Sequence, residues 1–237
     1  MLLNSCRPSL GIELSQRQGM VCARNAEGKE ETRTFPAGNR DRDELLPAID
    51  DVMKSIGATP CDLGLIGVDI GPGGFTGLRV SIATAQGIAE ISGACVVGVE
   101  GATVAVASTP VAAEAGGDVL VLLAAKQESV WAARLVLRNN EWVAASSPGL
   151  LDGPPEEWPA LVLGDSYLPS TMREAFEQKG VRIEPPVYDA ARLLDLAEIK
   201  AQRGEATPPE ALLPLYPREP EAVRLWDERR GYHKPTT

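Results

Sequence analysis

Histidine is almost absent from this sequence, and its scarcity excludes several kinds of active site. The chain of 237 residues contains one histidine, His233, so a zinc or iron site built on two or more histidines is excluded within it. A serine hydrolase needs a base beside its serine, and the one histidine stands near the C-terminus. The four cysteines form no CxxC pair, which predicts reduced, partly buried thiols of a cytosolic protein: Cys6, Cys22, Cys61 and Cys95.

Long apolar runs and dense basic runs are absent as well. No apolar run approaches the roughly 20 residues that a membrane span needs, and the first residues lack a basic segment followed by an apolar one. A cytoplasmic protein with no membrane partner is therefore expected. The formal net charge is −10, and an acidic chain binds a phosphate backbone weakly, because such binding draws on clustered Lys and Arg. We therefore expect any nucleic acid to be contacted mainly by a partner.

Hydrophobic periodicity predicts two successive lobes of strands and helices. Aromatic residues make up 5% of the chain, so the core is expected to consist of Val, Leu, Ile and Ala. Alternating apolar residues predict strands, and apolar residues at intervals of three and four predict helices. The predicted strands span 10–14, 19–24, 30–35, 63–70, 96–99, 119–123, 130–137, 142–145 and 161–163, with residues 1–4 as a short opening strand. The predicted helices span 43–56, 76–91, 101–108, 171–179 and 192–203, with a linker at 112–117, a surface loop at 146–159 and an extended tail from residue 205.

The order of these elements indicates the fold class. Three meander strands, a helix, a strand and a second helix follow one another in actin-like and ribonuclease-H-like folds, which are α/β folds of two lobes with mixed sheets and flanking helices. We expect an N-terminal lobe over residues 1–111 and a C-terminal lobe over residues 112–237. A fold-level analogy of this kind says nothing about activity.

A glycine-rich loop, residues 71–79 (GPGGFTGLR), joins a predicted strand to a predicted helix. Its backbone N–H groups could bind a phosphate at the helix N-terminus. The loop lacks the GxxxxGK[ST] spacing and its lysine, however, and it misses GxGxxG because Thr76 stands where the third glycine belongs after Gly71 and Gly73. A tight structural turn with Thr76 as the N-cap of the helix is therefore the favoured interpretation.

Two helices are predicted to form a partner-binding surface. The helix at 76–91 carries small residues at every fourth position: Gly77, Ser81, Ala85 and Ala89. A face with so little bulk lets a second helix approach closely; the alternative is that this face packs on the chain's own sheet. The helix at 43–56 has more apolar positions than one buried stripe requires, so some are expected to face outward and mark an interface. These positions are Leu45, Ile49, Val52, Met53 and Ile56.

The loop and its surroundings resemble the TsaB (YeaZ) family. Residues 71–79 with the following ATAQG at 83–87 resemble the signature GPGSFTGLR…A.A.G of that family. The positions that match the motif loop are Gly71, Pro72, Gly73, Phe75, Thr76, Gly77 and Arg79. Upstream, LLP at 45–47 resembles the family's first helix. Downstream, AAKQESVWAARL at 124–135 is similar to its DAR…E.Y.A segment, and PLYPR at 214–218 resembles its C-terminal P.Y.R.

The resemblance implies a two-lobed actin-like ATPase fold and a role in tRNA modification. It implies a non-catalytic scaffold or activating subunit that binds a TsaD-type catalytic partner, which places threonylcarbamoyl on the adenosine next to the tRNA anticodon. The two helices described above would meet the partner's helices, or those of a second copy in a homodimer. ATP and metal are then expected on the partner and no cofactor in this chain, and tRNA is contacted only indirectly.

Departures from the family pattern argue against activity in this chain. The aspartate that usually ends the family's first strand is matched here by Asn4, the aspartate of DAR by Ala124 and its arginine by Lys126. The histidine that often precedes the first helix has no counterpart around Asn39 and Arg40. Hard cations such as magnesium need carboxylate oxygens. We therefore predict no catalytic, cofactor-binding or metal-binding residue.

Three other functions compete with the subunit role. A glycoprotease-like hydrolase would need a ligand set or a base that one histidine cannot supply, and an actin-like kinase would need the missing aspartates. A homodimeric interaction module with another partner is not excluded by the sequence. The carboxylates expected nearest the cleft between the lobes are Glu13, Asp69 and Glu128, and their use as a catalytic pair is not expected.

Overall fold

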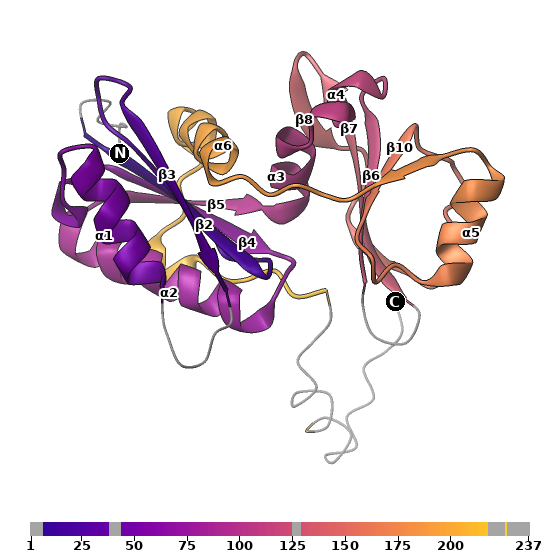
Figure 1. The fold of residues 1–237 in the computed structure, drawn as a ribbon, viewed down its shortest axis with the longest axis horizontal. Helices are drawn as coiled ribbons and strands as arrows, with labels where there is room; N and C mark the ends of the chain where they lie inside the picture. Colours follow the sequence, from indigo (N-terminus) through magenta and orange to yellow (C-terminus); the bar gives the residue numbers. More distant parts are fainter. Residues whose placement is uncertain (1–6, 38–43, 125–128, 218–225, 227–237) are drawn as a thin grey trace.

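The computed structural model describes residues 7–37, 44–124, 129–217 and 226. They form two lobes, each built on a mixed β-sheet (Figure 1). The first sheet has the strand order β3-β2-β1-β4-β5, and the second has the order β11-β10-β6-β7-β8 with β9 beside β7. The two-lobed α/β fold predicted from the sequence, of the actin-like type, is thereby confirmed.

The first sheet combines a meander with two parallel strands. β1 (Ser9–Glu13), β2 (Gln18–Arg24) and β3 (Glu30–Pro36) are antiparallel neighbours. β4 (Leu65–Gly71) lies parallel to β1, and β5 (Cys95–Glu100) lies parallel to β4. β1 and β4 are parallel neighbours in the interior of the sheet, so their C-terminal ends lie side by side.

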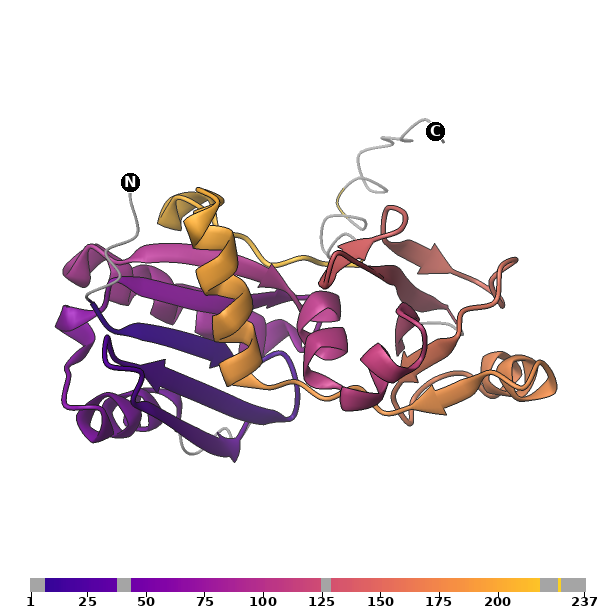
Figure 2. The ribbon, with the colours of Figure 1, turned by 90° about the horizontal axis from the view of Figure 1, so that it is seen from above.

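Helices cover both faces of this sheet. α1 (Leu45–Ser55) and α2 (Phe75–Ser92) cover one face, and α6 (Ala190–Gln202) lies across the other (Figures 1 and 2). Pro47 is tolerated as the third residue of α1, because the first helical N–H groups have no intrahelical acceptor to lose. After α1, Gly57 adopts the positive φ of 79° that favours glycine and ends the helix.

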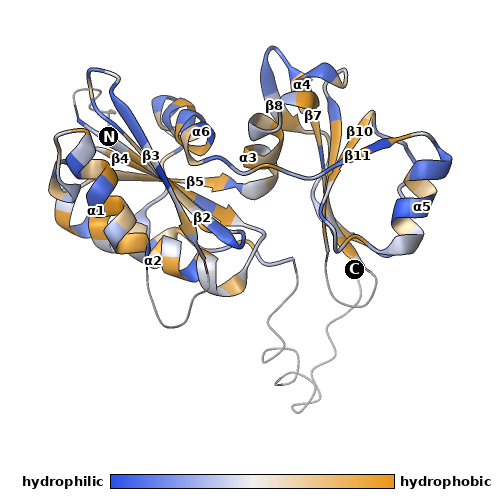
Figure 3. Ribbon diagram, viewed as in Figure 1, coloured by the Kyte–Doolittle hydropathy of each residue, from blue (hydrophilic) through white to orange (hydrophobic). Residues whose placement is uncertain are grey.

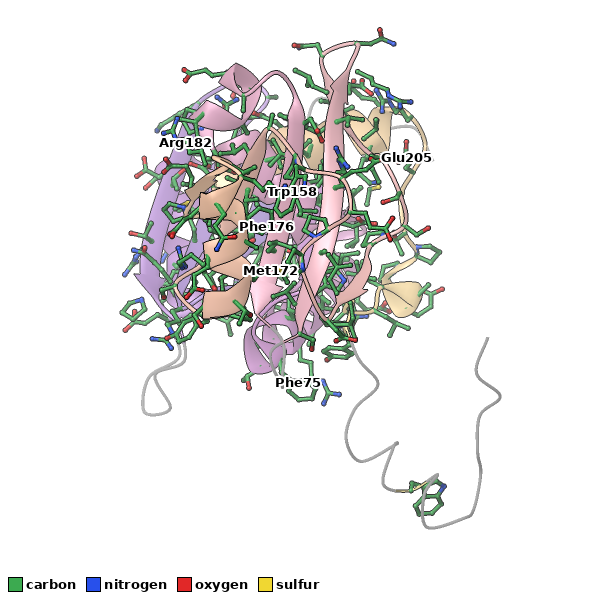
Figure 4. The ribbon with its side chains drawn as sticks, turned by 90° about the vertical axis from the view of Figure 1, so that its right-hand side faces the viewer. Phe75, Trp158, Met172, Phe176, Arg182 and Glu205 are labelled. Atoms are coloured by element: carbon green, nitrogen blue, oxygen red, sulfur yellow. The ribbon has the colours of Figure 1, made fainter. Side chains whose placement is uncertain are left out.

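The second sheet also lies between helices. Its strands are β6 (Asp118–Ala124), β7 (Val130–Arg138), β8 (Glu141–Ala144), β9 (Gly149–Leu151), β10 (Leu161–Gly164) and β11 (Arg182–Glu184). α3 (Gly101–Ser108) and α4 (Pro110–Glu114) pack on one face, and α5 (Ser170–Gln178) packs on the other. Phe176 and Met172 of α5 face the sheet beside Trp158 (Figure 4), whose ring meets that of Phe176 edge-on at 5.5 Å. Apolar residues gather on the strands and on the helix sides that meet them (Figure 3).

Several sequence predictions need correction. α6 and the tail after it were placed in the lobe 112–237, but Leu193 and Ala197 of α6 pack with Leu65 and Val97 of the first sheet. They do so because α1 and α2 cover only the opposite face and leave this one to α6. The predicted linker at 112–117 contains the end of α4, and the predicted loop at 146–159 contains β9. β11 was missed because three residues carry too little alternation. Residues 1–4 lie outside the described residues.

Candidate functional site

The glycine loop between β4 and α2 is held against the turn that follows β1. Gly74 donates its N–H to the carbonyl of Ser15 at 2.7 Å. A Cβ on Gly73 would lie 2.6 Å from the same carbonyl oxygen, and a Cβ on Gly77 would lie 2.0 Å from the carbonyl oxygen of Leu14. Such distances leave no room for a side chain. The glycines therefore serve a close contact inside the chain, which agrees with a structural turn.

The prediction that Thr76 caps α2 is wrong. The N-cap is Gly74, with an extended backbone and no side-chain cap, and Thr76 is the second residue of the helix with an exposed side chain. The first turn of α2 is instead fixed by the bond from Gly74 to the β1–β2 turn. A main-chain contact of this kind leaves no residue signature that a single sequence can show.

The small-residue face of α2 faces the chain's own core. Ala85 has no exposed surface, and Ser81 and Ala89 are buried, while Gly77 is half-buried against Leu14. The small side chains let α2 lie close to β4 and β1. The alternative interpretation, packing on the chain's own sheet, is therefore correct for this face.

The predicted apolar positions of α1 are buried too. They are Leu45, Ile49, Val52, Met53 and the C-cap residue Ile56. The assignment of these side chains, and of Ser81, Ala85 and Ala89, to a partner surface is thus wrong. The reason is that α1 stands over β2 and β3 and α2 stands over β4, so the apolar stripe of each helix packs on the sheet.

A different face of α2 is open to solvent and was missed. Val80, Ala83, Gly87 and Ile91 recur at intervals of three and four and are exposed, Ile91 by 77% of its surface. A Cβ on Gly87 would meet no atom within 4 Å. Leu46 of α1, 56% exposed, lies on the same side of the first sheet. The pattern 80, 83, 87, 91 was visible in the sequence, but it competed with the stronger stripe at 77, 81, 85 and 89.

The C-terminal tail crosses the start of α2. Leu215 donates its N–H to the carbonyl of Ile70 at 2.7 Å, and Gln86 of α2 donates to the carbonyl of Pro209 at 2.7 Å. The ring of Tyr216 stacks on that of Phe75 with centroids 5.3 Å apart. These contacts form what we call the tail strap, residues 205–217. The expectation of an extended tail that packs back on the surface is confirmed for residues 205–217, with one 3-10 turn at Pro209–Ala211.

Arg79 fastens the tail strap. Its Nε donates to the hydroxyl of Tyr216 at 2.9 Å, and its guanidinium lies 4.0 Å from the ring centroid of Phe75. Phe75, which projects from the start of α2 (Figure 4), is therefore sandwiched by the residues that hold the tail. Two motif segments that the sequence analysis treated separately, 71–79 and 214–218, are joined at this point.

Two buried carboxyl groups stand at the ends of β1 and β4. Glu13 is 1% exposed and Asp69 has no exposed surface. Ser15 donates from its N–H and its hydroxyl to Glu13 Oε1 at 2.8 and 2.6 Å, and the N–H of Gly71 donates to Asp69 Oδ1 at 2.6 Å. Burial, and then the neighbouring charge of Asp69, holds the pKa of Glu13 well above its usual range; burial also raises the pKa of Asp69.

The prediction that Asn4 stands in the place of a strand-end carboxylate stays a prediction. β1, the strand that starts the meander, ends at Glu13, whereas Asn4 lies outside the described residues. Lys126, Glu128, Asn39 and Arg40 lie outside them as well, and Ala124 is the last residue of β6. Within the described part of the chain, no group of three or more His, Cys, Asp or Glu residues could hold a metal ion.

A cavity of about 640 Å³ opens beside the glycine loop between the lobes. The turn after β1 and the first turn of α2 line it from the first lobe, and Asp165 and Tyr167 line it from the second. Arg17 closes one side: its guanidinium lies 5.2 Å from the ring centroid of Tyr167 and donates to its hydroxyl. Across the described ranges, no helix is both long and apolar enough to span a membrane.

Comparison with known proteins shows which family model and which solved structures the chain resembles. Residues 37–149, which contain α1, the glycine loop and α2, match the family model TsaD: tRNA N6-adenosine threonylcarbamoyltransferase. An uncharacterised protein with similarity to peptidase YeaZ from Pseudomonas aeruginosa superposes with a TM-score of 0.73 at 23% identity, over 90% of this chain and 100% of that one. The chain has the YeaZ fold. A second structure, YeaZ from Pseudomonas aeruginosa, gives a TM-score of 0.70 at 23% identity over 89% and 99% of the two chains.

The resemblance noted in the sequence is confirmed by the fold and by the family model. The YeaZ fold extends over nearly the whole chain, and the TsaD-family match covers the segment in which the sequence resemblance was strongest. No curated protein matches the chain.

Proposed function

We propose that the chain is a non-catalytic scaffold or activating subunit of a complex that places threonylcarbamoyl on the adenosine next to the tRNA anticodon. It acts by binding a TsaD-type catalytic subunit, which carries the ATP and the metal. The YeaZ fold and the TsaD-family match over residues 37–149 support this proposal. The complex works in the cytoplasm.

The exposed stripe of α2 is the observation on which the proposal rests. Val80, Ala83, Gly87 and Ile91 combine apolar surface with very little side-chain bulk on one side of the helix. Small residues in such a stripe allow a second helix to approach closely, and exposed apolar surface of this kind marks an interface. The stripe, extended by Leu46 of α1, therefore replaces the buried residues as the partner-binding surface.

The carboxyl groups at the ends of β1 and β4 fit a subunit that carries out no catalysis itself. Glu13 and Asp69 are closed to solvent and are engaged by Ser15 and by Gly71. Carboxylates that hold a metal–nucleotide complex must present oxygens to it, whereas these two are buried and one oxygen of each is bonded to the chain. This supports placing ATP and metal on the partner.

Contact with tRNA is indirect in this proposal. At a net charge of −10 the chain repels a phosphate backbone, so the catalytic subunit supplies the basic surface. In the absence of that subunit, the same α2 stripe pairs with a second copy of the chain. A homodimer in isolation and a heterodimer in the complex then use one surface and exclude each other.

A substitution pair at Gly87 tests the proposal. Gly87→Arg places a long charged side chain in the stripe and should weaken association with a TsaD-type partner by more than about 2 kcal/mol, roughly thirtyfold in Kd. Gly87→Ala is the matched control: it keeps the stripe small, and it should stabilise the exposed helix by about 1 kcal/mol. Association is measured by calorimetry and co-purification, and folding by thermal denaturation.

The outcomes separate the alternatives. If Gly87→Arg folds and still binds the partner like the parent chain, the stripe is not the interface. If the parent chain self-associates but ignores every TsaD-type partner, it is an interaction module of another system. Loss of partner binding in Gly87→Arg without a fall in melting temperature supports the proposal.

A further inference from the structure

The two buried carboxyl groups occupy adjacent strand ends. β1 and β4 pair in parallel with Ile12 opposite Val68, so Glu13 and Asp69 are the next residues along each strand. Successive side chains of a strand alternate between its faces. A Cβ on Gly67, two residues before Asp69, would lie 2.5 Å from Cβ of Ala197 in α6. Asp69 therefore points to the same side of the sheet, away from α1 and α2.

The surroundings of this pair are closed on every side. Gly101 at the start of α3 lies against Asp69, and a Cβ there would stand 3.1 and 3.2 Å from the two carboxyl oxygens. The hydroxyl of Tyr188, which precedes α6, is buried near the pair, and burial followed by the charges of Asp69 and Glu13 holds the pKa of this phenol well above the usual range. The next charged group outward is Asp165, which also raises the pKa of Tyr188.

One oxygen of each carboxyl group has no hydrogen-bond partner among the described residues. Glu13 Oε1 and Asp69 Oδ1 have donors in Ser15 and Gly71, whereas Glu13 Oε2 and Asp69 Oδ2 are buried without a partner in the described structure. A buried polar atom left without a partner costs free energy. β1 and β4 are hydrogen-bonded neighbours, so the two carboxyl groups stand next to each other at the strand ends. A proton between them would supply both missing partners at once.

The charges around Glu13 and Asp69 also indicate that the pair holds a proton. The groups that face the pair are the hydroxyl of Ser15 after β1, the N–H of Gly71 after β4, and the phenol of Tyr188 before α6, with Asp165 behind it. None of them is a cation, and no ion pair of the described residues includes Glu13 or Asp69. Two like charges at this distance in a dry site cannot both be ionised cheaply, so one group keeps its proton.

We propose that Glu13 and Asp69 share one proton in the folded chain at neutral pH, with Glu13 as donor and Asp69 as acceptor, and that this proton fastens the glycine loop to the turn after β1. Glu13 fixes Ser15, whose carbonyl accepts the N–H of Gly74, and Asp69 fixes Gly71 at the other end of the loop. The shared proton joins these two anchors. Its loss to solvent leaves two adjacent carboxylates that repel each other between these two anchors of the glycine loop.

The proton makes the folding equilibrium depend on pH in a defined direction. Below the ordinary pKa values of 4.5 for Glu13 and 3.8 for Asp69, folded and unfolded chains hold the same protons and the pair adds no pH dependence. Above these values the unfolded chain releases its protons while the folded chain keeps the shared one. The folding constant therefore falls as the pH rises, by up to tenfold per pH unit, until the raised pKa of the folded pair is reached.

Glu13→Gln removes this dependence while keeping the bonds. The amide Nε2 can donate to Asp69, and the amide oxygen can accept from Ser15. We expect the ratio of folding constants, variant over parent, to rise by up to tenfold per pH unit between pH 4.5 and the pKa of the folded pair, measured by denaturant unfolding. Glu90→Gln, at an exposed position of α2, is the control and should give a ratio that does not change with pH. A constant ratio for Glu13→Gln overturns the proposal.

Two measurements on the parent chain stand even if the variant does not fold. With glutamate labelled by ¹³C at the carboxyl group, one glutamate should remain in its protonated form at pH 7, seen by infrared absorption or NMR; full ionisation of all glutamates contradicts the shared proton. Titration with KCl or MgCl₂ distinguishes a cation from a proton. If either salt raises the melting temperature specifically and removes the protonated signal, a metal ion occupies the gap and the proposal is wrong.

Amide hydrogen exchange tests whether the carboxyl pair holds the glycine loop against the turn after β1. Amide hydrogen exchange at Gly74 should be protected to a similar extent in the parent and in Glu13→Gln, because both keep Ser15 in place. In Glu13→Ala, which removes the acceptor for Ser15, the protection should fall at least tenfold relative to amides of the second lobe. Unchanged protection in Glu13→Ala shows that the pair does not hold the loop. This inference does not depend on the proposed function.

Discussion

Arg79 and Tyr216 are joined by a hydrogen bond of 2.9 Å across 137 residues of sequence. Arg79 belongs to the first turns of α2, and Tyr216 belongs to the tail strap, which starts beyond α6. Together with Phe75 they form a stack of two rings and one guanidinium at the surface. This stack holds the tail over the loop, and it explains why an aromatic residue and an arginine stand at positions 75 and 79: each has a partner in the tail.

The first prediction concerns this stack. Tyr216→Ala removes the ring contact with Phe75 and the acceptor for Arg79, and it should lower the free energy of unfolding by about 1–2 kcal/mol. Limited proteolysis should cut the tail strap faster in the variant. Tyr216→Phe, which keeps the ring and loses only the hydroxyl, should fall between the two. Equal cutting rates for all three chains would show that the stack does not hold the tail.

Cysteine reactivity provides a second prediction. Cys22 is fully buried, and burial raises its pKa to about 12, whereas Cys61 is exposed. The thiolate is the reactive form, so iodoacetamide at pH 8 should alkylate Cys61 in the folded chain and leave Cys22 unmodified. Peptide mass spectrometry measures both sites. Labelling in denaturant, where both should react, is the control, and prompt labelling of Cys22 in the folded chain would contradict its burial.

A third prediction concerns the attachment of α6 to the first sheet. Arg24 of β2 binds Glu30 of β3 at 2.6 Å, and it binds Asp195 and Glu198 of α6 at 2.7 and 2.9 Å. Arg24→Met leaves Glu198 without its cation and Asp195 with Arg192 alone, and it should destabilise the chain by about 1–3 kcal/mol, between the values for exposed and buried pairs. Urea unfolding in low and high salt is the measurement. The difference between variant and parent should shrink in high salt, because salt screens half-exposed ion pairs.

The matched control for Arg24 lies in the second lobe. Arg134 binds Asp118 at 2.8 Å and Glu157 at 2.9 Å, but no part of the first sheet depends on it. Arg134→Met should lower stability without loosening α6. If hydrogen exchange in α6 responds equally to both substitutions, Arg24 is not the attachment.

The sequence predicted the elements far better than it predicted the site. Alternation and helical spacing located β1 to β5, α1 and α2 almost residue by residue, because each of these elements buries one regular face. The same periodicity could not say which face of α2 meets the sheet, since Ala85 and Gly87 stand on opposite sides and both are small. Only the position of β4 beneath the helix decides between them.

The pair of Glu13 and Asp69 illustrates a second limit of predicting a site from the sequence. Glu13 and Asp69 lie far apart in sequence, and each is an unremarkable acid at the end of an apolar strand. Their meeting depends on the parallel pairing of β1 with β4, which the alternation pattern does not specify. The same pairing shows that β1, the first strand of the meander, ends at a carboxylate, Glu13.

The last prediction decides between the two faces of α2. Ala85 has no exposed surface and lies in the core formed by α1, α2 and the first sheet, whereas Ala83 is exposed on the other side of the same helix. Ala85→Arg forces a long cation into a close-packed apolar site, where it has neither room nor a partner. The expected loss is more than about 4 kcal/mol, a large part of the stability of a domain of this kind. Ala83→Arg should change the free energy of unfolding by less than about 0.5 kcal/mol.

Thermal and urea denaturation of the two lone chains measure the contrast, because no partner is required to see it. Both substitutions add the same side chain to the same helix, so helix propensity and net charge cancel in the comparison. A stable Ala85→Arg chain would mean that α2 presents its small-residue face outward, and the interface would then return to Ser81, Ala85 and Ala89. A collapse of Ala85→Arg beside a stable Ala83→Arg that no longer binds a TsaD-type partner would place the interface on Val80, Ala83, Gly87 and Ile91.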